Sequence, residues 1–396
     1  MKRLVLILFI VPFIFSSLSI QAFIQKFISV GISQVIAYMN VGLVLLGLFL
    51  YIKFLEIRPL PSTLKYWFLF LCAFYSIGII GNIRFNTEVP FLKTLISPIY
   101  LVGYTFFLSD REYRKVFVNC VLITFSLANI LLIYFKYINF SLDETDGIAR
   151  YLLDRAGGVY GDANNAAVVC LLSLVFLHYY YKPLKIQFKR LKWLLMAMTV
   201  YSLLLTFSKT GLVVLLLVVL LSQYKYFNPK KIFLIIVVMP LLLFGLVKFA
   251  LESDTLSSVQ KERIENVVNI VTLNTDKIEL SGRDVLFKRM MEYVYENPFL
   301  GNGIYFSDLI RGHNTIFGVW ADAGIISFIL FLFLLFNYYK EAFSSSLELR
   351  YFSWSVLLIL TIFMLSLQTI INQPYLIVLF SFLSFELQTT SILKLK

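Results

Sequence analysis

The chain has 396 residues, of which 59% are hydrophobic and 15% are charged, and its mean hydropathy is +0.82. No soluble core could bury this much apolar surface, so the composition excludes a soluble globular protein and predicts an all-α integral membrane protein. The formal net charge of +12 follows membrane topology, so it does not call for a nucleic-acid partner.

Apolar runs of roughly 20 residues recur along the chain, and each is long enough to cross a hydrocarbon layer as a helix. They predict about twelve transmembrane helices in a single polytopic domain that covers residues 1–396. The predicted spans are 4–24, 30–52, 64–81, 92–108, 116–138, 163–181, 191–207, 208–224, 232–250, 314–337, 351–371 and 374–390. The run at 191–221 also fits one long tilted helix, but basic residues flank it on both sides, which favours a hairpin of two spans.

The distribution of Lys and Arg gives the orientation, because basic residues accumulate in cytoplasmic loops. With the N-terminus placed inside, the inner segments hold most of the Lys and Arg, and the outer segments hold most of the acids. We therefore expect both termini in the cytoplasm. Cys72, Cys120 and Cys170 fall inside predicted spans, so neither a disulfide framework nor a metal cluster is indicated.

Two predicted outer loops are long and polar. Residues 139–162 are rich in acids and glycine, and residues 251–313 form the largest polar segment. Loops beyond about 15 residues are usually functional or disordered, and amphipathic patterning in the larger loop argues against disorder. That patterning predicts one amphipathic helix at 256–273 and another from Ser281 to about Asn297. The apolar side of the second helix comprises Leu286, Met290, Met291 and Val294.

Arg283 lies in the first turn of that second helix, where a cation opposes the helix dipole. Helix stability therefore does not explain this residue, whereas a bound phosphate or diphosphate would, because N-terminal N–H groups and a guanidinium both favour an anion. Ser281 is expected to cap the helix, with Asp284 three residues on. The alternative is that Arg283 pairs with Asp284, Glu279 or the phosphate of an outer-leaflet lipid.

His313 and Asn314 lie where the large loop enters the next predicted span. An imidazole is mostly neutral at pH 7 and suits a base or a hydrogen-bond acceptor for a sugar hydroxyl. The alternative is a boundary histidine satisfied by solvent or lipid headgroups. Asn314 has the residue type of an N-cap, which alone would explain it.

Asp162 and Asn164 open the span at 163–181, where these residue types are ordinary caps. Lys209 lies in the outer turn of the predicted hairpin. It is a candidate for binding an anion, and the alternative is a lysine whose side chain only extends to the membrane surface. One orientation places Arg155 and these residues at the same outer face as Arg283 and His313. We therefore expect the group to bind an anionic, lipid-linked substrate.

Short motifs occur at Arg155 with 158–164, then at 208–211, 281–283, 297–303, 313–314 and 322–324. In this order, they resemble the bacterial O-antigen ligase and polymerase superfamily of membrane glycosyltransferases, the Wzy and WaaL type. Two positions depart from the family pattern. Ala163 stands where a proline is common, and Lys209 stands where an arginine is frequent, which replaces a bidentate fork by a point charge.

The resemblance implies a GT-C-like fold and a polymerase of undecaprenyl-diphosphate-linked repeat units at the outer face of the bacterial cytoplasmic membrane, acting in O-antigen, capsule or exopolysaccharide synthesis. It implies no metal and no cofactor. The implied partners are the lipid-linked glycan, membrane lipid, a chain-length regulator and the flippase of the same pathway. The implied catalytic residues are Arg283, Arg155 and His313, and the implied substrate-binding residues are Lys209, Ser281, Asp162, Asn164 and Asn314.

Two alternatives remain open. A ligase would transfer finished polymer to a lipid A core or to a protein, and it shares the same motifs. A transporter or flippase would place ionisable residues and broken helices near the bilayer midplane. In this sequence Lys248 and Asp322 lie near the ends of predicted spans, and Pro240 with Gly245 gives the only sequence hint of a broken helix.

Overall fold

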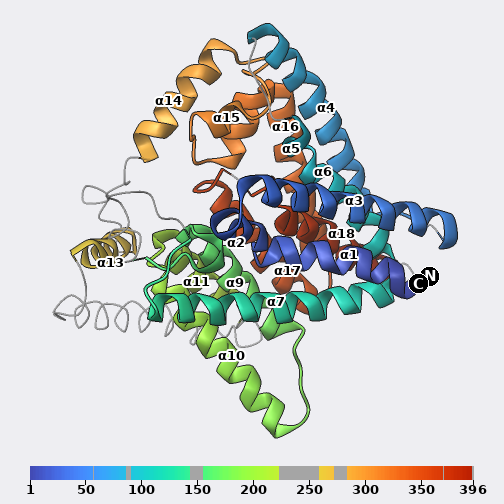
Figure 1. The fold of residues 1–396 in the computed structure, drawn as a ribbon, viewed down its shortest axis with the longest axis vertical. Coiled ribbons are helices and arrows are strands. Elements are labelled where there is room, and N and C mark those ends of the chain that lie inside the picture. Colours follow the sequence, from blue (N-terminus) through green and yellow to red (C-terminus); the bar gives the residue numbers. More distant parts are fainter. Residues whose placement is uncertain are drawn as a thin grey trace. The chain divides into compact units, whose positions relative to one another are not determined.

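A computed structural model describes residues 1–56, 58–85, 91–142, 155–222, 258–271, 283–368 and 370–394, and within these ranges the secondary structure is helical (Figure 1). The chain divides into two compact units. Unit 1 comprises Met1–Val121 and Ser281–Lys396, and unit 2 comprises Leu122–Leu280. We describe each unit by itself.

Among the described residues, six helical segments are long and apolar enough to cross a membrane, or up to seven if one bent pair counts as a single span. The six are Val30–Phe54 (α3), Ser62–Phe85 (α4), Leu92–Ser109 (α5, Phe91–Thr94, with α6, Ile96–Ser109), Arg111–Tyr137 (α7), Thr315–Ser344 (α16) and Leu347–Met364 (α17). Shorter apolar helices are Ala163–Tyr179 (α9), Lys209–Ser222 (α11) and Pro374–Gln388, within α18 (Pro374–Lys394). The protein is therefore a multi-pass membrane protein, whereas the number twelve stays a prediction. The predicted span at 232–250 lies outside the described residues.

The first predicted span, residues 4–24, is not one straight helix. It forms α1 (Lys2–Ser17) and α2 (Ile20–Phe27), which are bent by 63°. Ser19 at the bend has a φ of 49°, a left-handed conformation that ends one helix before the next begins. Hydropathy alone does not detect such a bend, because the apolar run continues through it.

In unit 1, α4 and α16 lie side by side, and α18 packs against α6 and α4 (Figure 1). Trp67 of α4 lies in this core, and its ring centroid is 5.3 Å from that of Phe380 in α18. Its indole N–H donates to the hydroxyl of Tyr338 in α16, at 2.8 Å. Lipid tails are as apolar as the side chains of a membrane helix, so the hydrophobic effect does not drive one helix onto another. Close packing and interhelical hydrogen bonds such as this one hold the helices together instead.

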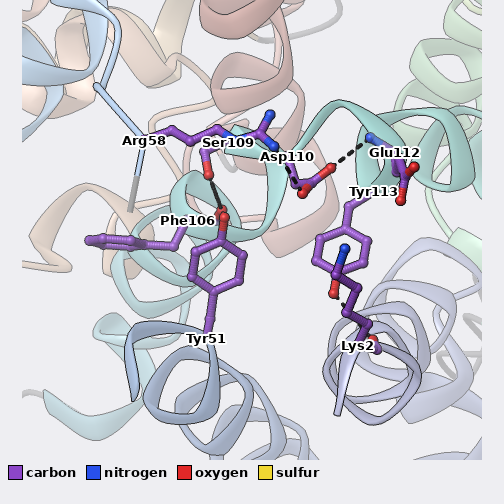
Figure 2. Close-up of polar contacts among 8 residues, drawn as sticks. All are labelled: Lys2, Tyr51, Arg58, Phe106, Ser109, Asp110, Glu112 and Tyr113. Atoms are coloured by element: carbon purple, nitrogen blue, oxygen red, sulfur yellow. Dashed lines mark hydrogen bonds and ion pairs between the residues drawn. The ribbon is translucent and has the colours of Figure 1, made fainter. Parts of the chain in front are cut away.

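At the turn between α6 and α7, polar contacts join three parts of unit 1 (Figure 2). The Tyr51 hydroxyl, at the end of α3, lies 2.8 Å from the Ser109 hydroxyl. Asp110 accepts the backbone N–H of Glu112 at 2.8 Å and pairs with the Arg58 guanidinium at 3.3 Å. Asp110 therefore stabilises the start of α7, because its carboxylate satisfies a helix N–H and faces the positive end of the dipole.

Unit 2 contains the C-terminal part of α7 from Leu122 on, the short 3-10 helix η1 (Gly158–Tyr160), α9, α10 (Ile186–Leu205), α11 and α13 (Ser258–Val271). α10 and α11 are separated by Thr206, Phe207 and Ser208, and Phe207 has a φ of 46°. The run at 191–221 is therefore two helices with a break between them rather than one long helix, and that each of them spans the membrane stays a prediction. Both helices pack against α9.

Candidate functional site

Four of the predicted residues form one polar cluster in unit 2, where α9 and α11 begin. Asp162 is the N-cap of α9: its Oδ1 accepts the backbone N–H groups of Asn164 and Asn165, each at 2.8 Å. Asn164 is buried, and its Oδ1 accepts the Ser208 hydroxyl at 2.9 Å and an Arg155 guanidinium N–H at 3.4 Å. The predicted role of Asp162 as the N-cap of this helix is therefore confirmed. Asn164 links Arg155 to the start of α11.

Arg155 also contacts the end of α10. Its Nε donates to the carbonyl of Thr206 at 3.3 Å, and the neighbouring Ala156 N–H donates to the carbonyl of Leu205 at 3.0 Å. Carbonyls at a helix C-terminus lack partners within the helix and carry partial negative charge, so an arginine there is stabilising. Arg155 therefore has a structural role at the end of α10. The same contacts keep its guanidinium beside Asn164.

Lys209 is the first residue of α11 and follows directly on Ser208, whose hydroxyl accepts the backbone N–H of Gly211 at 3.1 Å. As with Arg283, a cation in a first helical turn does not favour the helix itself. The start of α11 thus places a lysine directly after Ser208, whose hydroxyl contacts both Gly211 and Asn164. That Lys209 binds an anion stays a prediction.

In unit 1, the segment 297–303 fills a break in α16. At Ala323 and Gly324 the backbone of α16 is not helical. The freed groups bond to the segment instead: Ile325 N–H donates to the Pro298 carbonyl at 2.9 Å, and the Asp322 carbonyl accepts the Gly303 N–H at 2.9 Å. A broken helix is tolerated at membrane depth when protein satisfies its backbone, as here.

Two glycines of these motifs have a steric reason to be glycine. Gly324 has φ 72° and ψ 179°, a region that essentially only glycine occupies, and a Cβ there would lie 1.9 Å from the Phe299 carbonyl oxygen. Gly301 has a φ of 70°, and its Cβ would lie 2.6 Å from the backbone of Asp322. These glycines belong to packing rather than to substrate binding.

Asp322 lies at that break and is buried, with 7% of its surface exposed. Its carboxylate accepts the Ser307 N–H at 2.6 Å, the Ser307 hydroxyl at 3.1 Å and the backbone N–H of Tyr305. The sequence hint of a break at Pro240 and Gly245 lies outside the described residues, and the break at Gly324 in α16 was not predicted. Sequence periodicity missed this because α16 is apolar on both sides of the break.

His313 and Asn314 lie at the start of α16 in unit 1. Asn314 is the N-cap, since its Oδ1 accepts the Phe317 N–H at 3.0 Å, so the capping interpretation is confirmed. His313 is exposed and has a φ of 48°. Its backbone N–H donates to Oε1 of Gln368 at 3.3 Å, which helps to hold this left-handed conformation.

The helix predicted after Ser281 is α14 (Arg283–Glu296). Met290 and Val294, from its predicted apolar side, are buried in a cluster with Ala321 of α16. α14 therefore packs on α16 rather than standing free. Arg283 begins α14 as expected, while Ser281 lies outside the described residues.

The predicted site residues thus fall into two groups. Arg155, Asp162, Asn164 and Lys209 belong to unit 2, and Arg283, His313 and Asn314 belong to unit 1. In the first group, hydrogen bonds join Arg155, Asp162 and Asn164, and Lys209 follows Ser208, which binds Asn164. That both groups form one site stays a prediction. Among the described residues, no three His, Cys, Asp or Glu side chains gather where they could hold a metal ion.

The fold and these clusters define a helical, multi-pass membrane protein with cations placed at helix starts. Residues 194–332, about a third of the chain, match the family model of the O-antigen ligase, Wzy_C. This match confirms the predicted resemblance to the O-antigen ligase and polymerase superfamily over residues 194–332. It does not distinguish polymerase from ligase. No curated protein matches the chain.

The matched range contains Lys209, Arg283, His313 and the whole break in α16. Arg155, Asp162 and Asn164 precede it. The contacts of Asn164 with Ser208 and Arg155 therefore join the matched range to the segment before it within unit 2.

Proposed function

We propose that the protein is a membrane glycosyltransferase that polymerises undecaprenyl-diphosphate-linked oligosaccharide repeat units at the outer face of the bacterial cytoplasmic membrane. It transfers the growing glycan to the next lipid-linked unit during O-antigen, capsule or exopolysaccharide synthesis. The observation that carries this proposal is the unit 2 cluster, in which Arg155 and Asn164 meet the starts of α9 and α11.

The proposed reaction breaks the bond between the anomeric carbon and the diphosphate. Negative charge then develops on the diphosphate, so preorganised cations and helix N–H groups stabilise the transition state most directly. Arg155, Lys209 and Arg283 are the cations assigned to this task, each at or beside a helix start. These cations take the place of a metal ion in the proposed mechanism.

The acceptor hydroxyl must reach the opposite face of the sugar. His313 is the residue that we assign to bind or orient it, since its side chain is exposed at the capped start of α16. Ser281, Asp162, Asn164 and Asn314 are assigned to substrate binding or to shaping the site. The proposed partners are the lipid-linked glycan and membrane lipid, with a chain-length regulator and a flippase of the same pathway. Both termini are proposed to lie in the cytoplasm.

A ligase would use the same residues with a different acceptor. One observation favours a transporter, namely the break in α16 beside the buried Asp322. In transporters, such unwound backbone lines a cavity and coordinates ions. In this protein the segment 297–303 already occupies the freed backbone groups, so the observation favours an enzyme.

The test is a deletion of the gene in its source bacterium, complemented with wild type, Arg283→Ala or His313→Ala. Surface glycan on a silver-stained gel and undecaprenyl-linked glycan in extracts are measured together. Arg289→Ala is the matched control, because it removes an exposed guanidinium from the same helix. Immunoblots of the membrane fraction establish that each variant accumulates.

Surface glycan limited to one repeat unit in the deletion and in both alanine variants is the expected result. Long polymer that remains on undecaprenyl diphosphate would establish the ligase instead. Normal polymer in the deletion strain would refute glycan transfer and favour transport. Normal polymer in the two alanine variants alone would refute our site assignment and leave the family relation intact.

A further inference from the structure

The connection between α17 and α18 binds the start of α16 on both sides of Asn314. In this connection, Oε1 of Gln368 accepts the His313 N–H at 3.3 Å, and the Leu367 carbonyl accepts the Thr315 hydroxyl at 2.6 Å. The connection lies outside the motifs that led to the proposed function. It nevertheless contacts His313, the residue assigned to the acceptor.

The orientation of the Gln368 amide follows from its contact with His313. A backbone N–H is a donor, so the amide atom that faces it is the oxygen, and the opposite orientation would place two donors against each other. Nε2 is therefore the amide atom that is not used by the His313 N–H. At 3.3 Å this bond is longer than the usual length of about 2.9–3.0 Å, so a small shift of His313 costs little.

Nε2 of Gln368 is buried, and in the described part of the chain it has no hydrogen-bond acceptor. Only 9% of the surface of Gln368 is exposed. A buried amide nitrogen without an acceptor is unfavourable, and native proteins retain few such groups. The bond to His313 requires only an oxygen, so it does not explain the nitrogen. A partner that brings its own acceptor would explain it.

The surroundings of Gln368 indicate which partner fits. The His313 side chain is exposed, and the first turn of the long helix α16 begins directly after it. Sugars carry oxygens on most of their carbons, so a glycan that binds at His313 brings further acceptors close to the same place. Lipid tails carry none, and an ordered water is the remaining alternative.

The segment that covers Nε2 is held in an unusual conformation. Arg311 and His313 have φ values of 53° and 48°. Non-glycine residues stay in this left-handed region only where their surroundings hold them. The long bond to Gln368 is one such contact, and polar contacts of this kind often tighten only when substrate binds. A shift of His313 on acceptor binding would therefore open Nε2 to the glycan.

We propose that Gln368 binds the acceptor glycan, with Nε2 donating a hydrogen bond to a sugar oxygen while Oε1 holds the backbone of His313. This inference rests on the proposed function and extends the acceptor side of the same site. Gln368 takes no proton and breaks no bond. Its contribution is to the binding of the acceptor, whereas the diphosphate of the donor is assigned to the cations.

The test uses the full-length protein in lipid nanodiscs, with long lipid-linked polymer as the donor and the single lipid-linked repeat unit from the deletion strain as the acceptor. Initial rates of elongation are measured while one substrate varies and the other saturates. Gln368→Glu is the first variant, because a carboxylate still accepts the His313 N–H but has no N–H to donate. Asn372→Asp is the matched control, since it makes the same change of amide to carboxylate at an exposed position of this connection.

Gln368→Glu is expected to raise the KM for the acceptor by about tenfold, the effect of one lost hydrogen bond, and to leave the KM for the donor unchanged. The kcat should change little, because the lost contact is one of substrate binding. Gln368→Met also loses the oxygen that holds His313, so it should raise the same KM and lower kcat as well. Asn372→Asp should retain the wild-type values.

A wild-type KM for the acceptor in Gln368→Glu would overturn the inference, because Nε2 would then meet only an ordered water. An equal rise in the KM for donor and acceptor would overturn it too, since the site would have loosened as a whole. If Gln368→Glu does not accumulate, the two KM values of Gln368→Met decide by the same criteria. A wild-type protein that elongates nothing would instead refute the proposed function, so the two failures are distinguishable.

Discussion

Gly324→Ala tests whether the break in α16 holds unit 1 together. Gly324 has φ 72° and ψ 179°, and a Cβ at this position would lie 1.9 Å from the Phe299 carbonyl oxygen. A side chain in so sparsely populated a backbone region costs about 1–3 kcal/mol. Relief of the clash moves Phe299 away and endangers the bond from Ile325 N–H to the Pro298 carbonyl, which contributes about 1 kcal/mol. We therefore expect a loss of about 2–4 kcal/mol in the free energy of unfolding.

The assay is an unfolding titration with SDS in mixed micelles, followed by tryptophan fluorescence. Gly42→Ala is the matched control, because it adds the same methyl group in α3 where nothing lies within 4 Å of the new Cβ. Equal unfolding free energies for Gly324→Ala and Gly42→Ala would show that the break is not needed. Our account of the segment 297–303 as structural would then be refuted.

Three further changes follow from the contacts of the two clusters. Asp322→Ala leaves buried N–H groups of the 305–307 loop unpaired and should lower the free energy of unfolding by about 1–3 kcal/mol in the same titration. Asp162→Ala removes the cap of α9 and should lower it by about 1 kcal/mol, whereas Asp162→Asn should retain most of it. Arg155→Lys loses the guanidinium fork that contacts both Thr206 and Asn164, and the elongation rate in nanodiscs should fall by about tenfold or more, because a hydrogen bond from a charged group contributes roughly 1.5–3 kcal/mol. An unchanged rate would show that Arg155 serves only α10.

The sequence predicted best what local chemistry decides. Asp162 and Asn314 are caps because a short polar side chain before an apolar run satisfies helix N–H groups wherever the helix later packs. The buried face of α14 followed from the spacing of Met290 and Val294, since residues four apart share one side of a helix. The family relation followed from the order of several short motifs, and the match to residues 194–332 confirms it.

The sequence predicted least where contacts join distant segments. Lys93 and Tyr305 are more than 200 residues apart, and no pattern around either predicts their hydrogen bond. The break in α16 was missed for another reason, because Gly324 lies in an apolar run that reads as one span. The Pro298 carbonyl, which accepts the Ile325 N–H at the break, belongs to the motif at 297–303. The sequence indicated this motif only through the family resemblance and did not predict its contact with α16.

Two acids within this region differ in their surroundings. Asp322 is almost fully buried, and its carboxyl group accepts the Ser307 N–H, the Ser307 hydroxyl and the Tyr305 N–H. A buried carboxyl group needs such partners, because it has lost its hydrogen bonds to water. Asp308 is only partly buried. Asp322 fixes the backbone that carries Asp308, since both of its bonds to Ser307 lie one residue before Asp308. Substitution of Asp322 should therefore lower the free energy of unfolding more than substitution of Asp308 does in the same SDS titration.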